Sequence, residues 1–240
     1  MLSENHEKPR AVKKFLAFFS AMLKVNADLT PMYIFHPYLT SQKIFLRRLT
    51  EKDAPELCQR ITSTIDSLNP WMDWAIKPYH IQYAQERIFS HESQWSSPMG
   101  SRAYGIFSMD DGSLIGEISA HHIELIANHT ALEESTAQLG YWICLDYQKK
   151  ALMREAVTLM TRYLLEAQSI QRVYVYCEAG NERSIQLPRA LGFTENPMLK
   201  SFTVNLLTKL YNDVHVFSRS SSDGLPIFSC SWSDQPVRSI

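Results

Sequence analysis

Apolar and polar positions along the chain change between two periods, which is typical of an α/β (α+β) fold. IFLRRL (44–49) alternates as a first strand does, and apolar residues then recur at helical spacing from Ala54 to Leu68. A second helix is predicted for residues 81–95. From Ser101 the period returns to two, and the Asp-Gly of DDGS between two apolar runs predicts a β-hairpin.

The second half of the chain repeats this change of period. AQLGYWI (137–143) follows a polar loop and is predicted to form a strand. The whole order of elements predicts a mixed, mostly antiparallel central sheet with helices on both faces. The remaining elements are a long helix over 151–168, a strand RVYVYCE (172–178), a short helix in NERSIQLPRALGF (181–193) and a last strand VHVFS (214–218).

These elements predict one domain over residues 41–218, with a segment on either side. Residues 1–40 are predicted to form an N-terminal extension in which two lysines precede the apolar run FLAFFSAML (15–23). An amphipathic helix on the domain or on a partner is favoured over a signal peptide, because no small-x-small cleavage site follows the run. A peripheral membrane contact is less favoured. Residues 219–240 are rich in Ser, Asp and Pro and are predicted to be a flexible tail.

Composition excludes several classes of protein. The chain has 240 residues, of which 45% are hydrophobic, enough for a packed core. Lys and Arg number 24 against 25 Asp and Glu, so there is no basic field for a nucleic-acid partner. The four cysteines lack the close spacing of a zinc site or a disulfide scaffold, and we expect reduced thiols in the cytoplasm. No apolar run approaches the roughly 20 residues of a membrane-spanning helix.

A set of motifs in a fixed order carries a family resemblance. LGYWI, then YQ three residues later and a helix, precede RVYVYCEAGNERSIQLPRALGF. Upstream stand IFLRRLTEKDAPEL, NPWMDW and LIGEISAHHIE. Over about residues 41–218 this set resembles the GNAT acyl-CoA N-acyltransferases, in particular the branch that acetylates the N-termini of ribosomal proteins. Each motif is weak alone, but the ordered set is specific.

The resemblance implies that two central strands splay apart and that the co-substrate acetyl-CoA lies in the gap. Pantetheine would run along AQLGYWI, and the diphosphate would meet the N–H groups at the start of the long helix, where unpaired donors and the helix dipole favour an anion. No metal is implied. The predicted coenzyme-binding residues are Tyr141, Trp142, Ile143, Gln148, Lys149, Lys150, Ala151, Leu152, Met153 and Asn181.

The loop before the long helix departs from the family pattern, which has glycine at the positions of Lys149 and Ala151. If Ala151 has helical dihedrals, its methyl group is harmless; if it has positive φ, strain of about 1–2 kcal/mol follows. Lys149 and Lys150 could offset this by adding positive charge beside the phosphates, worth about 1 kcal/mol. The alternative is an ordinary loop with solvated lysines, in a catalytically silent protein that serves as a binding module.

The candidate catalytic residues follow from the resemblance and from what the chemistry needs. Ser184 matches the family's general acid, although it and Asn181 also fit a helix cap. At two positions where relatives have acidic residues, this chain has Gln138 and, in the last part of the domain, a threonine. His121 and Glu117, which share one face of a strand, therefore remain as candidate bases. Either could instead be structural. A metal site of His121, His122 and His129 is disfavoured because adjacent strand residues point to opposite faces.

The energy of deprotonation favours one class of acceptor. Neutralising an α-amine at pH 7 costs about 1.4 kcal/mol, whereas a lysine amine costs about 4.6 kcal/mol. A site with a weak base therefore suits the N-terminal amine of a protein or peptide, or a small amine, attacking acetyl-CoA directly in a ternary complex. Trp71 and Trp74 are predicted to line the acceptor cleft, or to pack under the first helix. The sequence leaves monomer and homodimer open.

Overall fold

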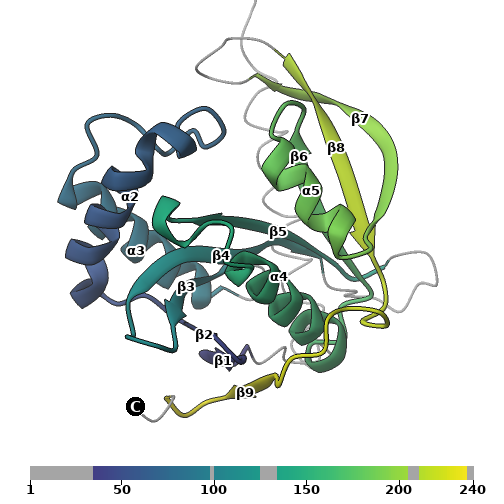
Figure 1. The fold of residues 1–240 in the computed structure, drawn as a ribbon, viewed down its shortest axis with the longest axis horizontal. Coiled ribbons are helices and arrows are strands. Elements are labelled where there is room, and N and C mark those ends of the chain that lie inside the picture. Colours follow the sequence, from purple (N-terminus) through teal and green to yellow (C-terminus); the bar gives the residue numbers. More distant parts are fainter. Residues whose placement is uncertain (1–34, 98–99, 125–133, 205–210, 237–240) are drawn as a thin grey trace, which may run out of the picture.

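A computed structural model describes residues 35–97, 100–124, 134–204 and 211–236. Within them the chain forms a nine-stranded sheet in the order β7-β8-β6-β5-β4-β3-β2-β1-β9 (Figure 1). The apolar run 15–23, for which an N-terminal helix was predicted, lies outside the described residues. The elements are β1 (Tyr38–Thr40), β2 (Ile44–Arg47), α2 (Ala54–Leu68), α3 (Ile81–Trp95), β3 (Arg102–Ser108), β4 (Leu114–Glu124), β5 (Thr136–Ile143), α4 (Leu152–Arg162), β6 (Arg172–Glu178), α5 (Glu182–Ala190), β7 (Thr194–Val204), β8 (Tyr211–Arg219) and β9 (Ser231–Ser233).

The sheet is mixed and mostly antiparallel, which confirms the predicted fold class. The parallel pair is β5 with β6, and its register joins Thr136–Leu139 to Arg172–Val175. From Gly140 onward β5 has no partner on that side, because β6 diverges from it. Over the last four residues of β5, the backbone groups that point away from β4 therefore have no strand partner within the described part of the chain.

The helices cover both faces. One buried cluster joins α2 and α3 to Phe107, Leu114 and Trp142 of the sheet. The other packs α4 and α5 on the opposite face, around Tyr163 and Phe217. Figure 1 shows α2 and α3 on one side of the splayed strands and α4 and α5 on the other. The divergence of β5 and β6 thus lies between two packed layers.

Three strands were not predicted. β1 and β9 have three residues each, too few for a periodic signal, and they pair with each other at the sheet edge. β1 lies just before the predicted domain bound of 41, and β9 lies within the segment predicted to be a tail, residues 219–240. β7 contains Pro197, which sits at a register shift of an edge strand, where a missing N–H is tolerated. The helix predicted over 151–168 has α-helical geometry over Leu152–Arg162 and then a π-helical turn, Tyr163–Ala167.

Candidate active site

A cavity of about 690 Å³ opens where β5 and β6 diverge. Its walls come from the free end of β5, the loop before α4, the first turn of α5 and the loop after α2. Concave sites of this size are typical of small-molecule binding. The lining residues are Asp66, Ser67, Leu68, Pro70, Trp71, Met72, Tyr141, Trp142, Ile143, Tyr147, Gln148, Lys149, Ala151, Leu152, Met153, Arg154, Gly180, Asn181, Glu182, Arg183, Ser184 and Leu187. All the predicted coenzyme-binding residues except Lys150 are among them.

The loop before α4 keeps a left-handed backbone although it has no glycine. Lys149 and Ala151 both have φ of 61°. Ala151 is the N-cap of α4, so the first residues of that helix, Leu152 to Arg154, face the cavity with N–H groups that lack an intrahelical carbonyl. Residues other than glycine in this conformation cost roughly 1 kcal/mol or more each. The helical alternative for Ala151 is therefore wrong.

This strain gives a stability prediction. Ala151→Gly is expected to raise the free energy of unfolding by about 0.5–1 kcal/mol, because glycine adopts positive φ without the steric cost. Ala156→Gly, at a buried position within α4, is the matched control and should lower it by about 1 kcal/mol or more. Urea denaturation measures both changes. A loss of stability in Ala151→Gly would show that the loop is not strained.

The first turn of α5 closes the opposite wall of the cavity. Asn181 Oδ1 accepts a hydrogen bond from Ser184 N at 3.3 Å, so the predicted helix cap is present. The Tyr141 hydroxyl of β5 donates to Ser184 O at 3.4 Å and ties the two walls together. Burial raises the pKa of Tyr141 well above its ordinary value, so this phenol stays neutral at pH 7. Both Asn181 and Ser184 line the cavity while serving the cap.

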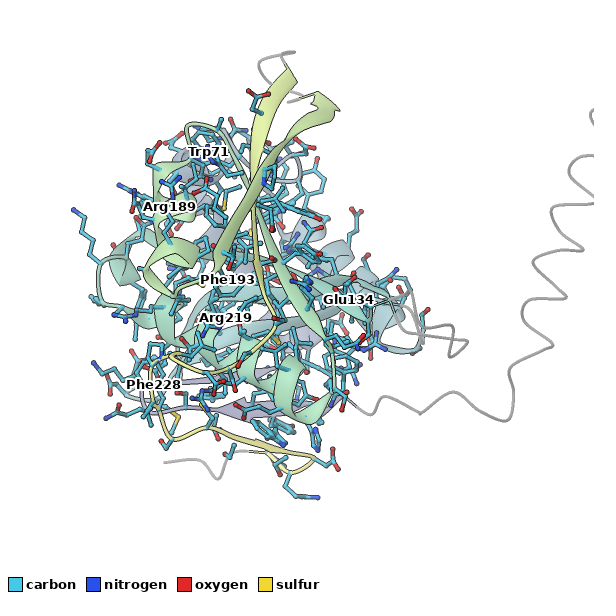
Figure 2. All side chains as sticks on the ribbon, turned by 90° about the vertical axis from the view of Figure 1, so that its right-hand side faces the viewer. Trp71, Glu134, Arg189, Phe193, Arg219 and Phe228 are labelled. Carbon is cyan, nitrogen blue, oxygen red and sulfur yellow. The ribbon has the colours of Figure 1, made fainter. Side chains whose placement is uncertain are left out.

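The two predicted acceptor-cleft tryptophans have different surroundings. Trp71 lines the cavity, and a Cβ at Gly180 would lie 3.6 Å from its Cη2, so the indole approaches the loop between β6 and α5. Trp71 lies above Arg189 of α5 in the side view, toward the end of the sheet from which β7 and β8 project (Figure 2). Trp74 does not line the cavity and packs against Trp142 instead, with the two ring centroids 6.1 Å apart.

Glu117 lies in a buried cluster behind Trp142. Its Oε2 accepts from Arg87 Nε and from Trp142 Nε1, each at 2.8 Å, and His91 Nδ1 lies 3.5 Å from Oε1. Burial alone would raise the pKa of Glu117, but Arg87, His91 and the indole N–H together hold the pKa below its ordinary value. The carboxylate of Glu117 does not line the cavity. Its hydrogen bond to the indole positions Trp142, which does line the cavity.

His121 reaches the point of divergence from the face that carries α2 and α3. Its Nε2 is 2.6 Å from Ser119 Oγ, and its Nδ1 is 3.1 Å from Ser101 Oγ. A Cβ at Gly140 would lie 2.8 Å from His121 Nε2, so the ring covers the first β5 residue beyond the β6 pairing. The imidazole is not part of the cavity lining. The sequence missed both serines, although Ser119 shares the strand face of His121.

Among the described residues, no group of three His, Cys, Asp or Glu side chains is placed to hold a metal ion. Of the histidines considered for such a site, His129 and the side chain of His122 lie outside the described part. No helix within that part is long and apolar enough to cross a membrane.

Comparison with known proteins agrees with this geometry. Residues 43–194 match the family described as the acetyltransferase (GNAT) domain. The chain belongs to the GNAT acetyltransferase family. GNAT acetyltransferases use acetyl-CoA.

Relatives of the chain include ribosomal acetyltransferases. YdaF of Bacillus subtilis (strain 168), provisionally named a ribosomal N-acetyltransferase, is 27% identical over 155 residues, 65% of this chain and 80% of YdaF. The ribosomal protein uS5 alanine N-acetyltransferase of Escherichia coli (strain K12) is 24% identical over 174 residues, 68% of this chain and 81% of that one. RimL, a ribosomal alpha-N-protein acetyltransferase solved with coenzyme A, shares the fold at a TM-score of 0.65 and 20% identity, over 76% of this chain and 96% of RimL.

Proposed function

We propose that this GNAT protein transfers an acetyl group from acetyl-CoA to the N-terminal α-amine of a protein or peptide, by direct attack in a ternary complex. One observation carries the proposal: the cavity joins the free backbone edge of β5 to the unpaired N–H groups at the start of α4. An extended diamide chain with a phosphorylated end fits such a cavity. The alternative is a protein of this fold that binds without catalysing transfer.

The residues present fit acetyl-CoA at both ends. The N–H groups of Leu152, Met153 and Arg154 and the dipole of α4 favour the diphosphate. The free edge of β5 beyond Leu139 pairs with the pantetheine amides as an added strand would. The left-handed loop keeps the Ala151 backbone in the geometry that glycine would take. The strain at this loop is of order 1 kcal/mol per residue, smaller than the contribution of several charge-assisted hydrogen bonds.

We assign the two proton transfers of the reaction to two residues on different elements, His121 of β4 and Ser184 of α5. When bound, acetyl-CoA supplies an activated thioester carbonyl, whose C–S bond breaks as the amine nitrogen forms a bond to the carbonyl carbon. His121 takes the proton released from the amine, either directly or through Ser119 Oγ at 2.6 Å. Ser184, in the cavity wall, gives a proton to the departing thiolate and regains one from solvent, so that its hydroxyl is left unchanged. Glu117 is ion-paired with Arg87, and we assign it to positioning Trp142.

Transfer to peptides tests this function. Incubation with labelled acetyl-CoA and peptides that begin with different residues is expected to place label on the α-amine. Matched peptides with a blocked N-terminus and an internal lysine should stay unlabelled at pH 7, because deprotonating lysine costs about 3 kcal/mol more. Label on the internal lysine would overturn the α-amine assignment. Binding of acetyl-CoA without transfer to any amine would favour the silent module.

A further inference from the structure

Basic side chains outnumber acidic ones in the lining of the cavity. Lys149, Arg154 and Arg183 line it, and none of the three forms an ion pair among the described residues. Of the two acidic lining residues, Asp66 is paired with Lys77, which leaves Glu182. Three cations therefore stand against one unpaired carboxylate. Such an excess in a concave site favours a ligand with several negative charges.

Arg183 occupies a special place in this group because it spans the cavity. It belongs to the first turn of α5, yet its Nη1 donates to Gln148 Oε1 in the loop before α4 at 2.6 Å. The Gln148 amide in turn donates to Ile143 O, the end of β5, at 3.5 Å. Both walls are thus connected at the side chain of Gln148. Arg183 was not predicted as a site residue, because it precedes Ser184 in a motif known for its Asn and Ser.

The hydrogen-bonding capacity of Arg183 is largely unused. A guanidinium has five N–H donors in a planar fork that matches the oxygens of a phosphate. Only the donor to Gln148 has a partner in the described part of the chain, and that partner is a neutral amide oxygen. A phosphate oxygen is a stronger acceptor than an amide oxygen. An anion in the cavity near Gln148 would therefore recruit the guanidinium.

We propose that Arg183 is a phosphate ligand of the coenzyme and forms, with Lys149, a clamp from opposite walls of the cavity. The inference rests on the proposed function. In this chain, side-chain charge thereby supplements a phosphate loop that has a lysine and an alanine in left-handed conformation. Both the diphosphate and the phosphate on the ribose present the oxygens that this clamp recognises, and substrates lacking one or both distinguish them.

Calorimetric binding of acetyl-CoA to the full chain tests the clamp. Arg183→Met, which keeps the aliphatic stem, is expected to weaken binding about 10- to 100-fold, the loss of one or two hydrogen bonds to a charged group. Lys149→Met should weaken it less, because a flexible ammonium acts as a point charge. Arg189→Met is the matched control, since Arg189 lies on the same helix, outside the lining, paired with Glu195. Its affinity should be unchanged.

Transfer from S-acetylpantetheine, which carries no phosphate, separates a clamp from a merely structural bridge. The clamp predicts equal kcat/KM for wild type and Arg183→Met with this donor, and a shallower salt dependence of acetyl-CoA binding in the variant. A loss in Arg183→Met that persists with acetyl-3′-dephospho-CoA assigns the diphosphate, and one that vanishes assigns the ribose phosphate. Equal acetyl-CoA affinity in wild type and Arg183→Met, or an equal loss with S-acetylpantetheine, would overturn the inference. Failure of wild type itself to bind acetyl-CoA would instead refute the proposed function.

Discussion

Arg87→Ala is expected to lower the free energy of unfolding by about 3–5 kcal/mol, because it leaves a buried carboxylate without its cation. Arg87 Nε lies 2.8 Å from Glu117 Oε2, and Glu117 is 3% exposed. The guanidinium also lies 3.9 Å from the ring centroid of Trp74, so the variant loses a cation–π contact as well. Urea denaturation at pH 7 measures the change. Arg87→Met with Glu117→Gln removes both charges together and should cost much less.

The pH dependence of this deficit has a defined sign. In the wild type the pKa of Glu117 is lowered in the folded state, so its contribution to stability is present above the unfolded-state pKa and is lost as pH falls through the folded-state pKa. Without Arg87, burial dominates and the pKa of Glu117 rises. The deficit of Arg87→Ala should therefore shrink between pH 7 and pH 4. A deficit that is the same at both pH values would show that the ion pair is not its cause.

His121→Ala is expected to lower the turnover of acetyl transfer about 100-fold at pH 7, within the usual contribution of a general base. The reduction should become smaller above about pH 9, where an α-amine with a pKa near 8 is already neutral. His80→Ala, at an exposed position just before α3, is the control and should keep wild-type turnover. The pH–rate profiles of the three proteins make the comparison. Equal rates for wild type and His121→Ala over the whole range would exclude His121 as the base.

Periodicity predicted the elements that bury one clear face. The helix over Ile81–Trp95 and the hairpin at Gly112 follow directly from apolar spacing and from a turn residue that tolerates φ of 71°. Periodicity could not predict β1 and β9, because each strand has three residues and is stabilised by pairing with the other. The pairing of distant short segments depends on the whole fold.

The candidate site was predictable where it is contiguous in sequence. The loop and helix start over 148–153 follow one another, so a single motif locates them. The partnership of Arg87 with Glu117 joins residues 30 positions apart on different elements, and no local pattern indicates it. Trp71 and Trp74 belong to one motif, but the path of the loop decides which of them faces the cavity. The positive φ of Ala151 is likewise set by its surroundings and is not visible in its residue type.

The most direct test of the central claim is calorimetric titration of the full chain with acetyl-CoA, combined with thermal unfolding. If the loop before α4 still holds the diphosphate, binding will saturate at one coenzyme per chain, and acetyl-CoA at 100 times its Kd will raise the free energy of unfolding by about 2.7 kcal/mol. The absence of both heat and thermal shift at millimolar acetyl-CoA would contradict the account.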